Sequence, residues 1–290
     1  MHAELLRQLE LGRRWADEAL ERRLATEDVP PLLVEALRYS LFGPGKRLRP
    51  ILVRLVCEAF GGRPRSAEAP AAAVEMVHAY SLVHDDLPCM DDDDLRRGRP
   101  TCHKVYGEAL AVLVGDALLT EAFALLAREA QAGALVAALA RGAGASGMVG
   151  GQVLDLHTTR EQLTREHVRA IHRAKTAALI GAACELGAIA AEAAPEGTEA
   201  ARRFGLCLGE AFQATDDILD VTEPTAALGK TAGKDQQAGK PTLVAVLGLA
   251  GARAEAMILA ERAREAARAL PGGSQGLFGA LAEHLLARRA

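Results

Sequence analysis

Two clusters of aspartate, far apart in the sequence, limit what this chain can fold into more than any other feature. Six of the ten residues in 85–94 are aspartate, and three more lie in the stretch DDILD at 216–220. At an effective dielectric constant of ~20, two unit charges about 4 Å apart repel by roughly 4 kcal/mol, so such clusters need cations. We predict that the fold brings the two clusters face to face, where they share divalent metal ions.

The choice of aspartate supports a metal site. The two clusters hold nine of the 14 aspartates of the chain, whereas a solvated helix face would accept glutamate, the better helix former, at least as readily. Short carboxylates suit Mg2+, which takes oxygen ligands in near-octahedral geometry and also binds substrate phosphates. For the run Asp91–Asp94 alone, which follows Pro88, a solvated acidic loop remains the stronger interpretation.

The composition indicates an aliphatic core and excludes an obvious nucleic-acid surface. Half of the 290 residues are hydrophobic but only 3% are aromatic. Removing the nine negative charges of the clusters from the net charge of −4 leaves +5, so the rest of the surface is mildly basic. This excess is too small and too dispersed to indicate binding of nucleic acid.

The five cysteines have no CxxC spacing, which argues against zinc and favours reduced thiols in a cytosolic protein. The first residues, MHAELLRQLELGRR, carry charges where a signal peptide needs an apolar stretch. No uncharged apolar run is long enough to span a bilayer. We therefore expect a cytoplasmic protein without a membrane span.

Apolar residues recur at helical spacing along the chain, and no segment shows the alternation of a strand. The class is therefore all-α. Glycines between 142 and 151 favour close helix packing. The predicted helices cover about 5–24, 30–43, 50–60, 67–87, 105–130, 134–156, 165–192, 198–220, 242–250, 252–270 and 275–289.

Several cations lie where they can meet an anion. The cations Lys46, Arg47 and Arg49 follow the helix-breaking sequence Gly43–Gly45 and precede a predicted helix, so this loop is a plausible anion site. Only six of the 34 basic residues are lysine, and they lie near predicted loops or the acidic clusters, as expected if lysine is used as a compact charge for phosphate. On the helix before the first cluster, His78 and Asp85 are seven residues apart and share a face.

Six stretches, in order along the chain, resemble the trans-isoprenyl diphosphate synthases (polyprenyl synthetases), most closely their bacterial farnesyl diphosphate synthase members. The two aspartate-rich motifs are highly specific for this family. The stretches are GKRLRP (45–50), EMVHAYSLVHDDLPCMDDDDLRRGRPTCH (75–103), GMVGGQVLDL (147–156), KT (175–176), FQATDDILD (212–220) and GKTAGKDQQAGKPT (229–242).

The resemblance implies a single domain over residues 1–290, a bundle of about ten or more helices around a central apolar cavity, and a homodimer. It implies head-to-tail transfer of a dimethylallyl or geranyl group from its diphosphate to isopentenyl diphosphate. Mg2+, with Mn2+ as a possible substitute, would be held by Asp85, Asp86, Asp91, Asp216, Asp217 and Asp220. The allylic diphosphate would be held by Arg96, Lys175, Lys230 and Lys240, and isopentenyl diphosphate by Lys46, Arg49, His78 and Arg97. Thr176 and Gln213 would stabilise the allylic cation.

Product length would be set next to the first motif. In this family a bulky residue just before that motif closes the hydrocarbon channel, and here Tyr80, followed by Ser81, lies five residues before Asp85, roughly 7.5 Å along a helix. We expect a C15 product, farnesyl diphosphate, with geranylgeranyl or geranyl diphosphate as alternatives. The alternative is that Tyr80 has only a structural role, as a side chain packed in the core.

Three rival classes fit less well: a terpene cyclase, a non-catalytic partner subunit and an EF-hand calcium protein. A terpene cyclase would carry Ser or Thr where this chain has Asp220, and Glu where it has Pro224. A non-catalytic partner subunit would be expected to have lost aspartates or lysines that are all present here. The loop sequence of an EF-hand calcium site is missing.

Overall fold

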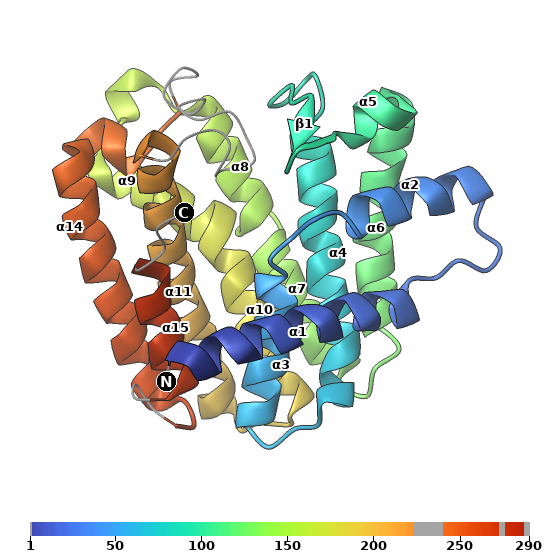
Figure 1. The fold of residues 1–290 in the computed structure, drawn as a ribbon, viewed down its shortest axis with the longest axis horizontal. Helices are drawn as coiled ribbons and strands as arrows, with labels where there is room; N and C mark the ends of the chain where they lie inside the picture. The colour runs from blue at the N-terminus through green and yellow to red at the C-terminus, as the bar shows by residue number, and fades with distance from the viewer. Residues whose placement is uncertain (1, 223–239, 273–275, 287–290) are drawn as a thin grey trace.

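The computed structural model describes residues 2–222, 240–272 and 276–286, and these residues form a helical bundle (Figure 1). This confirms the all-α class and the prediction of more than ten helices. The α-helices are α1 (His2–Arg23), α2 (Pro31–Leu41), α3 (Leu48–Ala59), α4 (Glu68–Asp85), α5 (Cys102–Tyr106), α6 (Glu108–Leu126), α7 (Ala132–Ala143), α8 (Met148–His157), α9 (Arg165–Ile171), α10 (Ala178–Ala190), α11 (Pro195–Thr222), α14 (Leu243–Ala266) and α15 (Leu277–Leu286). Short 3-10 turns lie at Pro64–Ala67, Arg160–Gln162 and Ala267–Ala269, and a π-helical turn lies at His172–Ala177.

The element boundaries differ from the prediction where glycine or a short turn intervenes. The helix expected over 105–130 is two helices, because Gly107 takes φ 84° between α5 and α6. The two helices expected after residue 242 form one element with a kink at Gly248, where φ is 68°. Residues 144–147 separate α7 from α8, which were expected as one helix.

One small strand pair was not predicted. β1 (Leu95–Arg96) and β2 (Arg99–Pro100) are antiparallel, with Arg96 opposite Arg99. The two residues between them, Arg97 and Gly98, both have positive φ, as a tight type I′ hairpin turn requires. Two-residue strands are too short to show the alternation by which a strand is recognised in a sequence.

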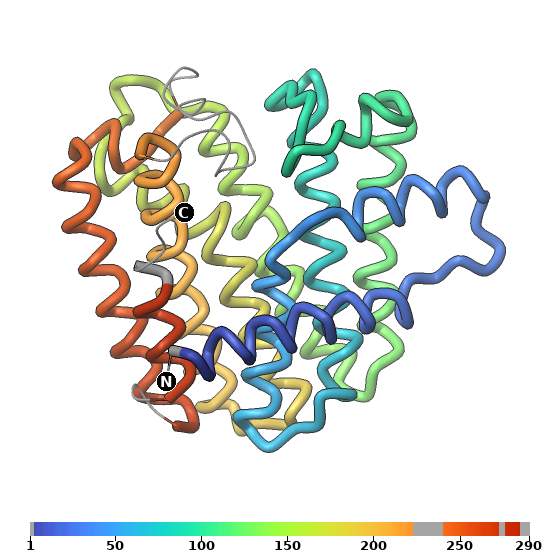
Figure 2. Tube along the Cα trace, viewed as in Figure 1, coloured from blue at the N-terminus to red at the C-terminus, as the bar shows by residue number. Residues whose placement is uncertain are grey.

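The helices pack in two halves that α10 joins, because α10 contacts α11 in one half and α4 in the other. α11 lies between α10 and α14, α4 lies against α6, and α10 packs against α3. In Figures 1 and 2, α8, α9, α11 and α14 form the left half and α2, α4, α5 and α6 the right half. α1 crosses in front of the lower part of the bundle, and its first turns lie beside α15.

The core is aliphatic, as the composition predicts. Phe204 is the largest fully buried side chain, and its ring meets that of Phe278 edge-on at 5.3 Å. The only tryptophan, Trp15, is half-buried in α1 with the guanidinium of Arg54 in α3 over its ring at 5.6 Å. The main core includes Leu5 of α1 and Phe278 of α15, which supports our proposal of one domain over residues 1–290.

Three segments of the described chain are long and apolar enough to cross a membrane, judged by length and composition alone. They are Glu108–Leu126, Ala132–His157 and Leu243–Ala269. Between a third and two fifths of the apolar stretch in each segment is buried inside the bundle. Part of this apolar character is therefore explained by helix packing, as where Gly142 of α7 lets Ala182 of α10 approach.

Candidate functional site

The first aspartate cluster lies where α4 ends. α4 ends at Asp85, and the chain then turns back on itself, so that the amide of Asp91 donates to the carbonyl oxygen of Asp85 at 2.8 Å. Asp92, at φ 48°, completes this turn. The reversal around Pro88 thus brings residues 85 and 91 of the first cluster together, as a straight helix would not.

The carboxyl group of Asp85 is held in an unusual electrostatic environment. Its pKa is raised to about 6, chiefly by burial and further by Asp91, while Lys175 opposes the rise. Gln152 of α8 donates to Asp85 Oδ1 at 2.9 Å. Both Gln152 and Lys175 come from the other half of the bundle, so this contact joins the two halves at the first motif.

Asp86 has a different partner. It is buried, and its Oδ1 accepts from Arg96 Nε at 2.7 Å and from a second guanidinium nitrogen at 2.5 Å. The pair ties the hairpin to the end of α4. Nearby, one ligand atom each of Asp92, Asp94 and buried His103 lie within 4.8 Å of one another, a set that could hold a metal ion. Lys104, however, already pairs with Asp94 at 2.7 Å.

The second cluster lies near the end of α11, in the opposite half. Asp216 is half-buried. Its negative charge raises the pKa of Arg49, at the start of α3, but burial lowers the pKa of Arg49 by more. Asp217 and Asp220 are buried. Asp217 accepts from Gln213 Nε2 at 3.2 Å, lies 3.1 Å from His172 Nε2, and accepts from the amide of Leu243 at 2.8 Å.

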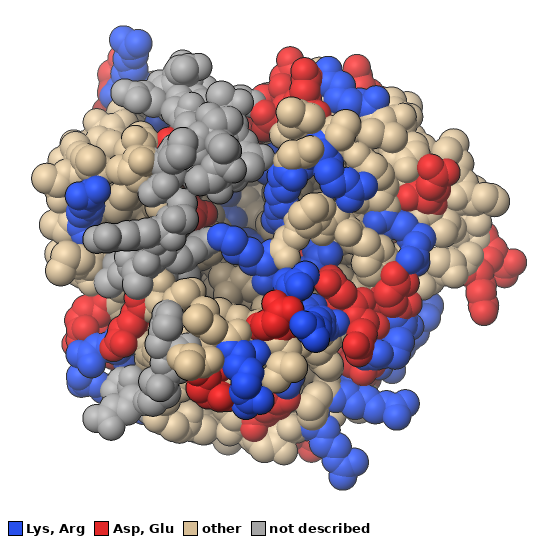
Figure 3. Space-filling model, in the orientation of Figure 1, with Lys and Arg blue, Asp and Glu red and all other residues tan. Residues whose placement is uncertain are grey.

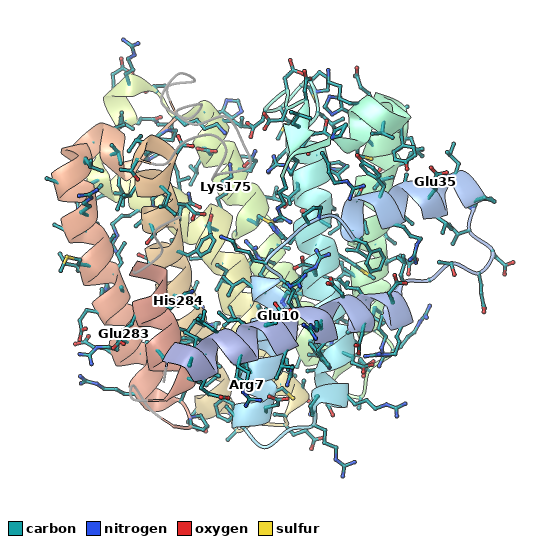
Figure 4. All side chains as sticks on the ribbon, viewed as in Figure 1. Arg7, Glu10, Glu35, Lys175, Glu283 and His284 are labelled. Atoms are coloured by element: carbon teal, nitrogen blue, oxygen red, sulfur yellow. The ribbon has the colours of Figure 1, made fainter. Side chains whose placement is uncertain are left out.

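The π-helical turn His172–Ala177 carries two of the predicted residues, Lys175 and Thr176. A π turn holds one more residue than an α turn and often occurs at functional sites. Lys175 Nζ lies 2.5 Å from Asp155 of α8, and Thr176 donates to Gln213 Oε1 at 2.8 Å. Figure 4 shows Lys175 in the upper part of the bundle, between the two halves.

The loop before α3 exposes Lys46 and turns its neighbour inward. Arg47 takes a left-handed φ of 50°, is 7% exposed, and pairs with Asp17 of α1 at 2.7 Å and Glu75 of α4 at 2.9 Å. Burial, together with Arg49 and Arg97, lowers the pKa of His78 well below its usual value, so this histidine is neutral. Burial also lowers the pKa of Arg49 to about 10.

Lys240, just before α14, reaches the first motif. Its Nζ lies 3.2 Å from Asp91 Oδ2. Lys230 lies outside the described residues. Figure 3 shows this face of the molecule hollowed near its centre, with basic side chains along the wall.

The predicted chain-length residues lie one turn below the first motif. Tyr80 is 7% exposed, and its ring meets His84 edge-on at 5.8 Å. Ser81 donates to the carbonyl oxygen of His78 at 2.9 Å. His84 Nε2 lies 3.0 Å from the carbonyl oxygen of Val112, so His84 packs between α4 and α6.

Four residues of this site were not predicted from the sequence: Glu75, Gln152, Asp155 and His172. Gln152 and Asp155 are three residues apart and so share a face of α8, which was a usable signal. Nothing local in the sequence marks Glu75 or His172, because each partner lies on another helix.

Comparison with known proteins agrees with this arrangement. The polyprenyl synthetase profile matches residues 30–269. The chain belongs to the polyprenyl synthetase family.

The chain is 43% identical to the farnesyl diphosphate synthase of Escherichia coli, over 97% of this chain and 98% of that one. It is 46% identical to a chloroplastic geranylgeranyl pyrophosphate synthase (number 9) of Arabidopsis thaliana, over 81% of this chain and 68% of that one. The structure of a Helicobacter pylori geranyltransferase, complexed with magnesium and isoprenyl diphosphate, matches with a TM-score of 0.79 at 32% identity, over 97% of this chain and 95% of that one. The chain is accordingly a prenyltransferase of this family.

Proposed function

We propose that the protein condenses isopentenyl diphosphate with dimethylallyl or geranyl diphosphate to give farnesyl diphosphate and pyrophosphate. The observation that carries the proposal is the meeting of the two halves at the first motif, where Lys240 contacts Asp91 and Gln152 contacts Asp85. Acids and lysines from distant elements thus converge at one place, as binding of a metal-bridged diphosphate requires.

The acids there suit a hard divalent cation. Asp85 carries a raised pKa because burial and Asp91 disfavour its charged form, and a bound cation would relieve that cost. We assign Mg2+, with Mn2+ as a substitute, to Asp85 and Asp91 and to Asp216 on the facing helix. When bound, the metal would neutralise charge on the diphosphate leaving group. Asp86 and Asp220 remain predicted ligands.

The protein residues have separate tasks in this proposal. Lys175 and Lys240, with Arg96 and the predicted Lys230, hold the allylic diphosphate. Lys46, Arg49 and Arg97, with neutral His78, hold isopentenyl diphosphate. Thr176 and Gln213 present oxygen dipoles to the allylic cation, which the double bond of isopentenyl diphosphate then attacks. The condensed cation loses a proton to the departing pyrophosphate. No protein nucleophile is needed, because the cation is trapped by the second substrate.

Product length is proposed to be C15, with Tyr80 as the wall of the hydrocarbon site. The buried position of its ring, one turn below Asp85, supports this assignment. Similarity to plant geranylgeranyl pyrophosphate synthases keeps a C20 product as the second candidate.

We propose a homodimer in the cytoplasm. α6 and its neighbour α5 expose Val112, Leu113 and Val105, and Leu113 is 56% exposed. An exposed apolar patch of this kind is typical of a protein interface. All five cysteines are free thiols, which suits a reducing compartment. Leu113→Glu should shift the protein from dimer to monomer in sedimentation velocity, whereas an unchanged dimer would place the interface elsewhere.

The decisive experiment is an incubation of the purified protein with Mg2+, isopentenyl diphosphate and either allylic primer. We expect a C15 alcohol after dephosphorylation of the product, and no product when EDTA is present. A C20 product would select the second candidate, and consumption of the allylic diphosphate without chain elongation would refute the proposed reaction.

A further inference from the structure

The side chain of Asp217 is committed to other contacts within the protein. It is buried at 4% exposure, although it belongs to the second aspartate motif. Oδ2 accepts from the amide of Leu243 at 2.8 Å and lies 3.1 Å from His172 Nε2. Oδ1 accepts from Gln213 Nε2 at 3.2 Å. Asp216, one residue earlier, points about 100° away around the helix.

These three contacts lead to three different elements. His172 begins the π-helical turn that carries Lys175 and Thr176. Leu243 is the first residue of α14 and follows Lys240 by three positions. Gln213 lies one turn before Asp217 on α11 itself. One carboxylate therefore connects the π turn, α11 and the segment that places Lys240.

The contact with Gln213 also fixes the direction of an amide. An ionised carboxylate can only accept hydrogen bonds, so Gln213 must turn its NH2 group toward Asp217. The amide oxygen then faces the other way, where it accepts from the Thr176 hydroxyl at 2.8 Å. Asp217 thus determines which atoms of Gln213 and Thr176 are presented to the reacting groups.

We propose that Asp217 is a positioning residue and not a metal ligand: it orients Gln213 and Thr176 and anchors the start of α14. The inference deepens the proposed function and rests on it only for the roles of Thr176 and Gln213 in the reaction. It distinguishes two adjacent aspartates of one motif, with Asp216 toward the metal and Asp217 toward the protein.

The first test compares metal binding in Asp217→Asn and Asp216→Asn. Mn2+ bound in the presence of inorganic pyrophosphate can be counted from the electron paramagnetic resonance signal of free Mn2+, without any turnover. We expect Asp217→Asn to bind as many ions as the unmodified protein and Asp216→Asn to bind fewer. A loss of Mn2+ in Asp217→Asn equal to that in Asp216→Asn would overturn the proposal.

The second test is a rescue that a metal ligand would not allow. In Asp217→Asn, the remaining oxygen is expected to stay toward the Leu243 amide, since a backbone donor cannot reverse. The new NH2 group then faces the NH2 group of Gln213, so Gln213 must flip and present NH2 to Thr176. We expect kcat to fall about tenfold or more, the effect of one misdirected hydrogen bond, with little change in either KM. In the double variant Asp217→Asn/Gln213→Glu, the glutamate again presents an acceptor to Thr176. The loss in log kcat should then shrink by at least about a third. No recovery would contradict the orienting role.

In a third measurement the deciding comparison is made on the unmodified protein, so its outcome does not depend on whether a variant folds. Hydrogen exchange at the Leu243 amide should stay slow when Mg2+ and pyrophosphate are added, because Asp217 keeps its contact with the protein. Faster exchange on metal addition would show that the carboxylate leaves Leu243, and would overturn the proposal. Thr242→Ala is the control for loosening of the α14 start alone, since Thr242 caps that helix through Ala245 at 3.1 Å. The count of bound Mn2+ and the hydrogen exchange do not depend on which reaction is catalysed, so failure of the proposed function would be seen separately in the product assay.

Discussion

Lys240 Nζ lies 3.2 Å from Asp91 Oδ2, although 149 residues separate the two in sequence. The contact brings a cation from the start of the last helices to the first aspartate motif. A metal ion at Asp91 must compete with this ammonium group, whereas a diphosphate bound beside the metal would attract it.

Lys240→Met should therefore change the binding of metal and diphosphate in opposite directions. We expect Mn2+ alone to bind about two- to fivefold more tightly, as removal of a partly exposed pair predicts, while pyrophosphate binds more weakly. Calorimetric titration of each ligand measures both. Arg202→Met is the control, because Arg202 pairs with Glu199 on α11, outside both aspartate motifs, at 2.7 Å. Equal tightening of Mn2+ in both variants would indicate a general charge effect.

Asp85→Asn should make the metal-free protein more stable while it removes activity. The pKa of Asp85 is raised to about 6 in the folded protein, so the folded state binds more protons than the unfolded state between pH ~4 and ~6. Stability is then lost as pH rises through that window, by roughly 1–3 kcal/mol. Asparagine stays neutral and avoids this loss. In EDTA, Tm of Asp85→Asn should exceed that of the unmodified protein at pH 7.5 but not at pH 4; a lower Tm at pH 7.5 would contradict this environment for Asp85.

Gly151→Ala should displace the π-helical turn, because Gly151 lies on α8, which packs against that turn. A Cβ atom at residue 151 of α8 would lie 2.1 Å from the backbone nitrogen of Lys175, so backbone must move. We expect a loss of about 1–3 kcal/mol in the free energy of unfolding and a large loss of kcat. Gly133→Ala in α7 is the control, since nothing lies within 4 Å of its added Cβ. Urea unfolding and initial rates would show whether the two substitutions differ.

Glu75→Gln should weaken the loop that carries Lys46. It removes the charge opposite buried Arg47, and breaking a buried pair costs about 3–5 kcal/mol. Because Arg47 lies between Lys46 and Arg49, we expect KM for isopentenyl diphosphate to rise more than KM for the allylic substrate. Glu21→Gln, which removes the exposed partner of Arg38 at 2.6 Å, should cost less than about 1 kcal/mol. Equal rises of both KM values would mean that Arg47 serves the whole site.

Tyr80→Ala should lengthen the product. Removing the ring opens space one turn below Asp85, so chain growth would continue to C20 or beyond, as sizing of the dephosphorylated products would reveal. Tyr106→Ala, at a tyrosine that hydrogen-bonds Glu35 at 3.1 Å, should leave product length unchanged. If Tyr80→Ala still stops at C15, the wall is formed by another residue.

The class and the main elements could be predicted because helical periodicity and glycine breaks are local properties of the sequence. The convergence at Asp85 and Asp91 could be predicted from Pro88 and the spacing of the acids. Arg47 could not, since its left-handed backbone and inward turn depend on Asp17 and Glu75 of other helices. The sequence likewise does not distinguish Asp217 from Asp216, because the difference lies in donors supplied by His172 and Leu243.

The contact of Trp15 with Arg54 makes the protein its own spectroscopic reporter. With a single tryptophan in the chain, the tryptophan fluorescence follows the surroundings of Trp15 between α1 and α3, whereas circular dichroism follows every helix. If both signals change at the same denaturant concentration, the amino-terminal helix and the bundle unfold as one cooperative unit.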